Sequence, residues 1–515
     1  MTKVVILSVP WCEAFPLVAP ALLSKCLQQA GIDSAGLDLN IKFIQEFYNK
    51  PYWSNLKIFL SNGYVDKQLN YRRMIIDLFK FIKRELLAIN LEHNPTHLGL
   101  SIFTNESINF SYLLIHYIRK YLPHVKIIVG GRGIESDCSL EKKPHYQKYF
   151  DHGLADLIVV GDAETAIIES IKSNHDGIYF SKKQNQQDLD NIPAPDWSHY
   201  NFSLYSTLTD EFAPADRLAA TFNPQAISIT ASKGCVRKCT FCDVANYWPN
   251  YIYRDGANVA RDIITTYRTT GIKNFEFTDN LINGSISHYR KMNTILAETI
   301  PREIAYSGYA IFRQKESMPA EDFRLASLAG CEAWGVGVES GSETVRYHMR
   351  KKFNNDDLDF GVKQLHKNNI RQTWCLMVGY PTETEDDFKE TLNLLRRYKN
   401  YNNNGMISLN ITQPFQLNQN TPLMQEEEFT STLNWAHEGD SNHHERFFWV
   451  TPGNPGNNFL SRYKRWHQLI DLSEELGYSY HMRMALLFSK WRDELESLKQ
   501  IYEQSNKKIF FFSRA

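Results

Sequence analysis

The stretch AISITASKGCVRKCTFCD, residues 226–243, decides how the chain is interpreted. Its first half alternates apolar and small polar residues as a strand does, and Gly234 allows a tight turn at the strand end. Cys235, Cys239 and Cys242 follow in a CxxxCxxC spacing on one short loop. Three thiolates so placed can hold three irons of a four-iron cluster and leave the fourth iron open to a chelating small molecule.

The residues around these cysteines are basic: Lys233, Arg237 and Lys238. Their positive charge favours ionised sulfur and offsets the negative charge of a thiolate-ligated cluster. The alternative is a structural zinc site, which normally needs four ligands. The next cysteines, Cys331 and Cys375, lie far along the chain in other strand regions, and a fourth ligand from Asp243 or a distant histidine stays open.

Six strand-like segments, separated by helical ones, start with this stretch. They read AISITAS, KNFEFT, EIAYSGYA, AWGVGVES, TWCLMVG and MISLNIT. This alternation predicts an open, partial (β/α)6 version of the eight-unit barrel over residues 226–425. Chemistry is then expected at the C-terminal ends of the strands.

Residues 1–185 also alternate between strands and helices. The strand-like segments are KVVILSV, SAGLDLN, THLGLSIF, VKIIVGG and ADLIVVG. The order predicts a doubly wound, Rossmann-like α/β domain whose ligand crevice lies beyond the carboxyl ends of parallel strands. The stretch from about 41 to 92 is long for a connection, so we expect an inserted helical segment there.

Two further regions complete the predicted organisation. Residues 186–225 contain IPAPDW, whose prolines disfavour helix, and are expected to form a linker. Residues 426–515 are expected to form a mainly helical C-terminal region. Its histidine-rich part, with His437, His443 and His444, is interpreted either as a lid over the barrel or as a packed surface subdomain.

The composition sets limits on function. The chain has 515 residues with 57 basic and 58 acidic side chains, a net charge of -1 that argues against general binding to nucleic acid or anionic membranes. The sequence contains no run of eighteen apolar residues, so no membrane span is expected. Eight cysteines are too few for a disulfide scaffold, and three of them are clustered, which favours metal binding in a reducing compartment and a cytoplasmic location.

The segment KGCVRKCTFCD after the first barrel strand resembles the radical S-adenosylmethionine (SAM) superfamily. The resemblance implies that the three cysteines bind a [4Fe-4S] cluster, whose free iron takes the amino and carboxylate groups of SAM. Electron transfer, from a donor such as flavodoxin or ferredoxin, then cleaves SAM to a 5′-deoxyadenosyl radical. Phe241 matches the family's apolar position beside the adenine.

Later strand ends supply further candidate cofactor-binding residues. Gly337, Glu339 and Ser340 follow the fourth strand, where glycine lets a ligand approach the backbone and the polar side chains can meet its polar groups. The structural alternative is a helix cap at Ser340 or Ser342. Glu276 and Asp279, at the second strand, are candidates for the amino group or ribose, although acidic turn residues often only form turns.

The segment MVGYPTETEDDF resembles the family's fifth-strand turn, at Gly379 and Pro381. Thr382 followed three positions later by Glu385 predicts a capping box at the start of the next helix.

A Rossmann-like domain before such a barrel resembles the cobalamin-binding subclass. The features that match are Gly130, Gly131, Gly161 and Glu164, together with the IPAPDW segment. In that subclass the domain binds the corrin, and many members transfer methyl groups to unactivated carbon. Residues 1–185 contain no DxHxxG pattern, so the lower-axial histidine of mutase-type cobalamin domains is not supplied in the usual way.

The resemblance implies an enzyme that methylates a carbon or phosphorus centre of a small metabolite or natural product. The alternatives are radical cyclisation, rearrangement or carbon–carbon bond formation without methyl transfer, and a non-catalytic, zinc-stabilised binding module. Methylthiotransferases, a further alternative, hold a second cluster on three N-terminal cysteines. Here Cys12, Cys26 and Cys138 are better interpreted as buried small side chains.

Overall fold

The structure is a computed structural model that describes residues 2–512, except 13, 15, 63–70, 136, 139–142, 206–225, 403–404, 419, 436–445 and 481. The chain divides into two compact units. The N-terminal unit holds most of the described residues up to 205, and the C-terminal unit holds most of those from Ile229 onward. Among the described residues, no helix combines the length and the apolar character that a bilayer crossing requires.

The N-terminal unit is built on a six-stranded parallel sheet with the order β2-β1-β3-β4-β7-β8. The strands are β1 (Lys3–Ser8), β2 (Asp33–Asp38), β3 (His97–Ser101), β4 (Lys126–Gly130), β7 (Leu157–Val160) and β8 (Gly177–Phe180). The doubly wound sheet predicted from the sequence is confirmed. Strand β8 extends it by one strand beyond the five that the sequence pattern indicated.

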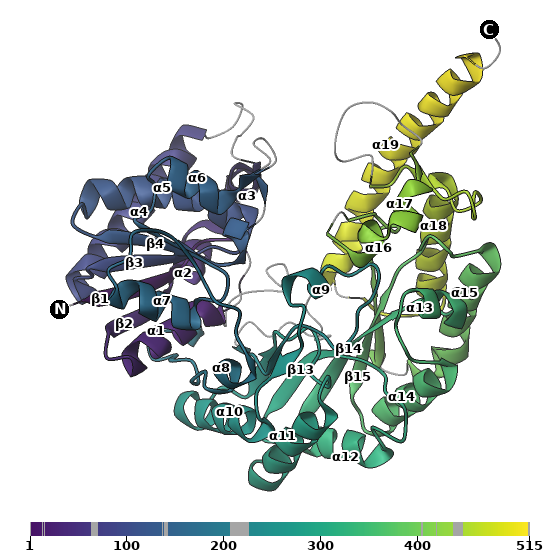
Figure 1. Ribbon diagram of the computed structural model, residues 1–515, viewed down its shortest axis with the longest axis horizontal. Coiled ribbons are helices and arrows are strands. Elements are labelled where there is room, and N and C mark those ends of the chain that lie inside the picture. Colours follow the sequence, from purple (N-terminus) through teal and green to yellow (C-terminus); the bar gives the residue numbers. More distant parts are fainter. Residues whose placement is uncertain are drawn as a thin grey trace. The chain divides into compact units, whose positions relative to one another are not determined.

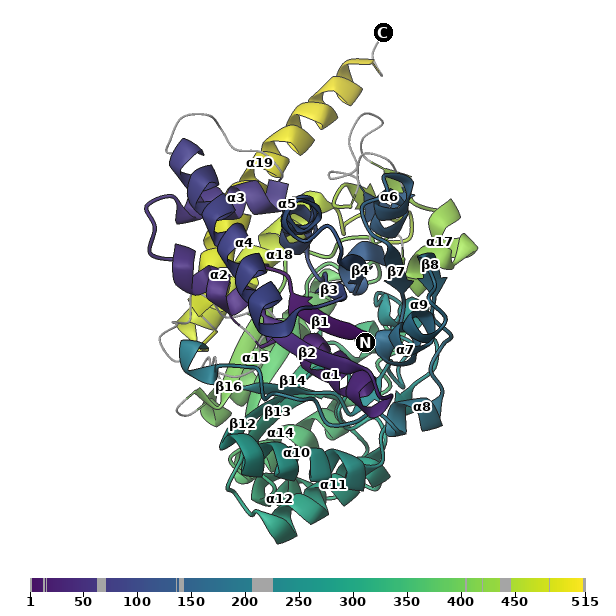
Figure 2. The same ribbon diagram turned by 90° about the vertical axis from the view of Figure 1, so that its left-hand side faces the viewer.

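Helices cover both faces of this sheet (Figures 1 and 2). The helices α1 (Val18–Gln29) and α7 (Ala163–Lys172) lie on one face, and α4 (Tyr71–His93) and α5 (Asn105–Tyr121) lie on the other. The predicted helical insertion is formed by α2 (Leu39–Phe47), α3 (Trp53–Asn62) and α4. A core of buried aliphatic side chains, including Val4, Ile6, Leu27, Ile128 and Ile167, joins the sheet to α1 and α7.

The first part of the predicted linker packs onto this unit. After α8 (Gln186–Asp190), Trp197 is buried and the Asp196 N–H donates to the Ala21 carbonyl (3.0 Å). The Tyr200 hydroxyl donates to the Leu17 carbonyl (2.9 Å). Residues 206–225 of the predicted linker lie outside the described part of the chain.

The C-terminal unit contains a six-stranded sheet with the order β9-β12-β13-β14-β15-β16, in which the strands from β12 to β16 run parallel. Its strands are β9 (Ile227–Ile229), β12 (Asn274–Phe277), β13 (Ala305–Ala310), β14 (Cys331–Glu339), β15 (Arg371–Leu376) and β16 (Ile407–Ile411). All six predicted strands are therefore present in chain order, which confirms the partial barrel. The connecting helices are α10 (Gly256–Thr270), α11 (Ile286–Thr299), α12 (Ala320–Leu328), α13 (Glu343–His348), α14 (Asn355–Lys367) and α15 (Glu385–Tyr398).

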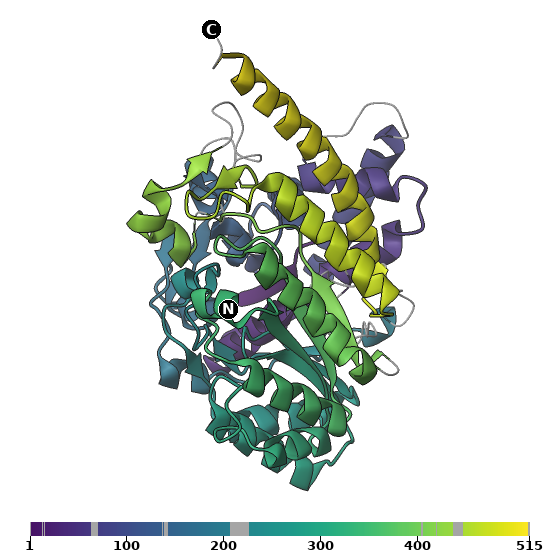
Figure 3. The same cartoon turned by 90° about the vertical axis from the view of Figure 1, so that its right-hand side faces the viewer.

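The region after β16 is mainly helical, as predicted. It contains α16 (Pro422–Gln425), α17 (Glu427–Ser431), α18 (Phe459–Glu475) and α19 (Met482–Phe512), with a small antiparallel pair, β17 (Asn434–Trp435) and β18 (Trp449–Val450). Helices α18 and α19 lie side by side, and α18 also contacts α15 (Figure 3). The histidines at 437, 443 and 444 lie outside the described residues, so the lid interpretation stays a prediction.

One predicted helix start is wrong by two residues. The capping box of α15 is formed by Thr384 and Asp387, and not by Thr382 and Glu385. The segment TETEDD offers two overlapping Thr-x-x-acid patterns, and the intervening Glu383 side chain points into the protein, where it accepts from the Gly379 N–H (2.7 Å). Burial of Glu383 thus selects the later register.

Candidate functional site

The three cysteines lie on one loop between β10 (Ser232–Lys233) and α9 (Val244–Tyr247). The Cys239 side chain is buried, whereas Cys235 and Cys242 are partly exposed. The Cys242 N–H donates to the Cys239 carbonyl (3.2 Å), and the Arg237 N–H donates to the Cys235 sulfur (3.3 Å). The three cysteines therefore follow β10 on one loop, and their ligation of a cluster stays a prediction.

Burial raises the pKa of the Cys239 thiol, and it raises the pKa of Cys242 to about 11. Lys351 and Arg237 oppose this shift at Cys239, because a nearby positive charge favours the thiolate. A metal ion bound by these sulfurs would favour the thiolates further. Three soft sulfur donors, with the buried Lys351 and the partly exposed Arg237 near Cys239, fit a thiolate-ligated cluster.

Within the described parts of the chain, no three His, Cys, Asp or Glu side chains form a group sized for one metal ion. That finding covers the three cysteines as well, so it does not distinguish a cluster from a zinc ion.

Next to the loop, Glu339 and Lys351 form a buried ion pair at the end of β14 (2.9 Å from Oε1 to Nζ). The Lys351 ammonium also lies 5.7 Å from the Phe241 ring centroid, which gives a cation–π contact. Burial lowers and the Glu339 carboxylate raises the pKa of Lys351, with a net upward shift. Lys351 thus connects the predicted residue Glu339 to the predicted residue Phe241 of the cysteine loop.

Because Gly337 has no side chain, it leaves room for the Glu339–Lys351 ion pair. A Cβ at that position would overlap the Glu339 carboxylate and the Lys351 ammonium. Glu339 itself has a φ of 65°, an uncommon conformation for a residue with a side chain, and the Met377 N–H donates to its carbonyl (3.0 Å). Such local strain is typical of functional sites, where the surrounding structure holds it in place.

Lys351 was not found by sequence reasoning. It follows α13 in the run MRKKF, where its neighbours Arg350 and Lys352 are exposed and resemble an ordinary solvated basic patch. Only the middle residue turns inward, because Arg350 and Lys352 both have positive φ and the chain reverses there. A signal did exist, since a buried acid at a barrel strand end requires a cation nearby.

Ser340 is fully buried behind this site. Its hydroxyl accepts from the Ser342 N–H (3.1 Å) and lies 3.3 Å from the Thr391 hydroxyl, while Ser342 caps α13. The alternative interpretation of Ser342 as a helix cap is therefore correct. Binding of a ligand by Ser340 stays a prediction, and its hydrogen bonds are made within the fold.

Asp279 is hydrogen-bonded to the residues that lead into the cysteine loop. Its carboxylate accepts from the Ala231 N–H (3.0 Å) and the Ser232 hydroxyl (2.5 Å). Burial raises its pKa to about 7, although those hydrogen bonds and Arg254 oppose the shift. Glu276 lies three residues earlier in β12 and is partly exposed. Contact of either carboxylate with a ligand stays a prediction.

In the N-terminal unit, the predicted residues follow strand ends at one edge of the sheet. Gly130 ends β4, and Gly131 has a φ of 103° at a position where a Cβ would overlap the Ile102 carbonyl. The Gly161 N–H, after β7, donates to the Glu135 carboxylate. Glu164 lies in the first turn of α7 and accepts from the Gln184 amide (3.0 Å).

Sequence reasoning missed an exposed aromatic residue at the same edge. Phe103 follows β3, is 51% exposed, and contacts the buried Trp11 ring edge-on, with the centroids 5.8 Å apart. An exposed aromatic side chain beyond the carboxyl ends of parallel strands lies where such sheets bind flat ligands. Cys26 is buried within α1, as expected. Cys12 is partly exposed after β1, so the buried interpretation is wrong there, and the Cys138 side chain lies outside the described part of the structure.

Comparison with known proteins agrees with this geometry. Residues 229–395 match the family model described as "Radical SAM superfamily". The anaerobic magnesium-protoporphyrin IX monomethyl ester cyclase of Synechocystis is 24% identical over 296 residues, which are 55% of this chain and 55% of that protein. The cytidylyl-2-hydroxyethylphosphonate methyltransferase of Streptomyces wedmorensis is 25% identical over 166 residues, 32% of this chain and 29% of that protein. The matches thus span about half or less of these curated relatives.

Two solved structures share the fold across both units. The radical SAM methyltransferase TsrM from Kitasatospora setae, with cobalamin and a [4Fe-4S] cluster bound, aligns with a TM-score of 0.56 and 13% identity, over 99% of this chain and 100% of that chain. The cobalamin-dependent SAM radical enzyme OxsB, with aqua-cobalamin bound, aligns with a TM-score of 0.61 and 13% identity, over 100% and 75% of the two chains. At these identities the likeness concerns the fold. The matched family model, which spans the cysteine loop and the Glu339–Lys351 pair, identifies residues 229–395 as a radical SAM domain.

Proposed function

We propose that the chain is a cobalamin-dependent radical SAM enzyme that methylates an unactivated carbon, or a phosphorus centre, of a small molecule. The observation that carries the proposal is the combination of the CxxxCxxC loop with a doubly wound N-terminal unit, in a fold similar to TsrM and OxsB over nearly the whole chain. The similarity to a phosphonate methyltransferase over 166 residues adds support for methyl transfer.

In this proposal Cys235, Cys239 and Cys242 would hold a [4Fe-4S] cluster, which would supply the electron for reductive cleavage of SAM. The protein's own contribution is placement. Phe241 offers an apolar face for the adenine, and Glu339, oriented by Lys351, offers a carboxylate to the polar groups of SAM. The buried position of this pair keeps water from the charged groups, and electrostatic interactions are stronger there than in bulk solvent.

The cobalamin part of the proposal rests on the N-terminal unit. Gly131 and Gly161 let the chain pass close to Ile102 and Ser181 beyond the strand ends, and Phe103 offers an exposed aromatic surface there. A flat macrocycle can lie against such an edge. Methylcobalamin would supply a methyl group to the substrate radical.

The test is anaerobic reconstitution followed by three measurements on one sample: iron and sulfide, cobalt, and turnover of methyl-labelled SAM. The proposal expects about four irons, bound cobalamin, 5′-deoxyadenosine and label in an added acceptor. Cys239→Ala should lose iron and 5′-deoxyadenosine formation and retain cobalamin, because the N-terminal unit has its own core. Cobalamin-free protein with normal cluster content would refute the methyl-transfer mechanism.

A second candidate function is radical cyclisation or another carbon-bond rearrangement. It is favoured by the similarity to the magnesium-protoporphyrin ester cyclase, which covers more of this chain than the similarity to the methyltransferase does. The same experiment separates the two functions. A cyclase forms 5′-deoxyadenosine without moving the labelled methyl group into product.

A further inference from the structure

Thr240, the first of the two residues between Cys239 and Cys242, is hydrogen-bonded to three other segments of the C-terminal unit. Thr240 is buried, and its N–H donates to the Met349 carbonyl (3.3 Å). Its carbonyl accepts from the Leu423 N–H (2.8 Å), and its hydroxyl is hydrogen-bonded to the Tyr380 hydroxyl (2.8 Å). Every polar group of Thr240 is therefore bonded outside the cysteine loop itself.

Of the three partners of Thr240, Tyr380 is the one that contacts it through a side chain. It is 3% exposed, its ring packs edge-on against Phe415 with the centroids 5.4 Å apart, and its hydroxyl also contacts the His348 carbonyl (3.3 Å). It belongs to a buried apolar cluster that includes Met349, Leu423 and Trp449, and Phe241 packs against that cluster. A rigid aromatic ring thus connects the cysteine loop to the turn after β15.

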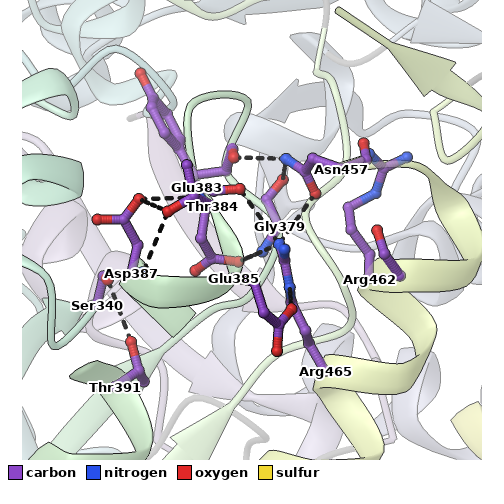
Figure 4. A network of polar contacts seen from close by, with 12 residues as sticks. Ser340, Gly379, Glu383, Thr384, Glu385, Asp387, Thr391, Asn457, Arg462 and Arg465 are labelled. Carbon is purple, nitrogen blue, oxygen red and sulfur yellow. Dashed lines mark hydrogen bonds and ion pairs between the residues drawn. The ribbon is translucent and has the colours of Figure 1, made fainter. Parts of the chain in front are cut away.

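The turn after β15 is itself held by hydrogen bonds and an ion pair from α18 and from the loop before it (Figure 4). The Asn457 amide donates to the carbonyls of Gly379 (3.3 Å) and Tyr380 (2.8 Å). Glu383 accepts from the Gly379 N–H and forms a buried ion pair with Arg465 (3.1 Å). All of these groups are buried, so a partial loss of contacts would leave costly unpaired polar atoms.

Arg462 completes the arrangement from the far side of the turn. It is fully buried and donates to the carbonyls of Asn457 (2.5 Å) and Phe447 (2.6 Å), and its guanidinium lies 3.8 Å from the Trp449 ring centroid. The side chain fills the space beside Gly379, where a Cβ would overlap it. The C-terminal region therefore contributes directly to the shape of the turn that holds Tyr380.

We propose that Tyr380 is a positioning residue for the cluster-binding loop, and that residues 447–465 hold Tyr380 in place. The Tyr380–Thr240 hydrogen bond fixes the position of the segment between Cys239 and Cys242. This goes beyond the proposed function and depends on it only in regarding the cysteines as cluster ligands. The claim about the loop itself can be tested on the metal-free chain.

The test is the rate at which iodoacetamide alkylates Cys239 in the full-length, metal-free, reduced protein, measured by peptide mass spectrometry. Cys26, buried in the other unit, is the internal reference. Alkylation of a buried thiol requires local opening, and loss of one hydrogen bond raises the open population about fivefold. Tyr380→Phe and Thr240→Val should each speed alkylation of Cys239 about fivefold, and the double variant should be no faster than either. Thr240→Ser, which keeps the hydroxyl, should behave as wild type.

Tyr478→Phe is the matched control, because it removes another buried tyrosine hydroxyl, bonded to the Leu395 carbonyl (2.7 Å) away from the loop. It should leave the Cys239 rate unchanged. Asn457→Ala should speed Cys239 alkylation, and Asn402→Ala, which removes a bond to the Gly477 carbonyl (2.9 Å), should not.

Several results would overturn the proposal. These are an unchanged Cys239 rate in Tyr380→Phe, an equal acceleration in Tyr478→Phe, or wild-type alkylation as fast as in urea. A second readout is the paramagnetic spectrum of the reduced, reconstituted protein, where Tyr380→Phe should retain iron and shift the signal. If no cluster forms while the alkylation pattern is as expected, the proposed function fails and the positioning role stands. If the cluster forms normally and the alkylation pattern is absent, the reverse holds.

Discussion

The Glu339 carboxylate lies 2.9 Å from the Lys351 ammonium, and both side chains are buried beside Cys239 and Phe241. Removing one member of such a pair leaves an uncompensated buried charge. Lys351→Met should therefore lower the free energy of unfolding by roughly 3–5 kcal/mol, measured by urea denaturation of the metal-free protein. The exposed neighbour provides the control, since Lys352→Met should change it by less than about 0.5 kcal/mol.

The same pair allows a sharper test. The double variant Glu339→Gln, Lys351→Met should recover most of the lost stability, because no charge is left unpaired. It should nevertheless bind SAM more weakly than wild type if Glu339 meets the ligand. Stability losses that simply add, or unchanged SAM affinity in the double variant, would contradict this account of the pair.

Asp279 predicts a pH dependence of stability. Burial raises its pKa from 3.8 to about 7. Between these values the folded protein retains a proton that the unfolded chain has released, so stability falls as the pH rises. The stability of Asp279→Asn relative to wild type should rise by up to about 1.4 kcal/mol per pH unit from about pH 4 to about pH 7 and then level off. Urea denaturation at pH 5, 6, 7 and 8 measures this difference.

Asp386→Asn, on the exposed face of α15, is the control for this experiment. A difference between wild type and Asp279→Asn that stays flat from pH 5 to pH 7 would show that the Asp279 carboxylate is ionised throughout.

A substitution of Phe103 tests whether cobalamin binds beyond the carboxyl ends of the strands in the N-terminal unit. Because the ring is half exposed, Phe103→Ala should change the unfolding free energy by less than about 1 kcal/mol. Loss of an aromatic contact with the corrin should weaken cobalamin binding about tenfold, measured by equilibrium dialysis with the cobalamin absorbance as readout. Leu91→Ala, 88% exposed at the C-terminus of α4 and near the opposite edge of the sheet, should bind cobalamin as wild type does. Equal binding by both variants would exclude Phe103 from the site.

Alanine substitutions at Gly379 and Gly477 separate the cost of backbone strain from the cost of steric overlap. Gly379 and Gly477 have similar positive φ values, 88° and 72°, but a Cβ at Gly379 would overlap Arg462, whereas nothing lies within 4 Å of one at Gly477. Gly477→Ala should cost about 1 kcal/mol of stability, and Gly379→Ala about 1–3 kcal/mol more. The melting temperatures of the two variants, measured side by side, check this difference. Equal losses would mean that Arg462 is not packed against the turn.

Much of the fold could be predicted because its signals are local. Each barrel strand has its own apolar run, and the order of the runs determines the parallel sheet. Strand β8, with the short sequence GIYF between polar stretches, has no comparable pattern, since none of its side chains is fully buried. The start of α15 was misplaced because two capping patterns overlap, and only the tertiary contact of Glu383 with Arg465 selects between them.

The site was predictable where its chemistry lies within one segment. The cysteine loop is such a segment, and the family resemblance added Phe241 and Glu339. Lys351 and Tyr380 were not found, because their roles depend on contacts between distant parts of the chain, such as the Tyr380–Thr240 bond across 140 positions. A single sequence carries no local pattern for such contacts.

The most direct test of the central claim is the paramagnetic resonance spectrum of the anaerobically reconstituted, reduced protein before and after SAM is added. If the three cysteines leave one iron open, the spectrum shows a reduced [4Fe-4S] cluster whose signal shifts when SAM binds, and Cys239→Ala abolishes it. A cluster signal that SAM leaves unchanged, or a protein that takes up zinc and no iron, would contradict the account.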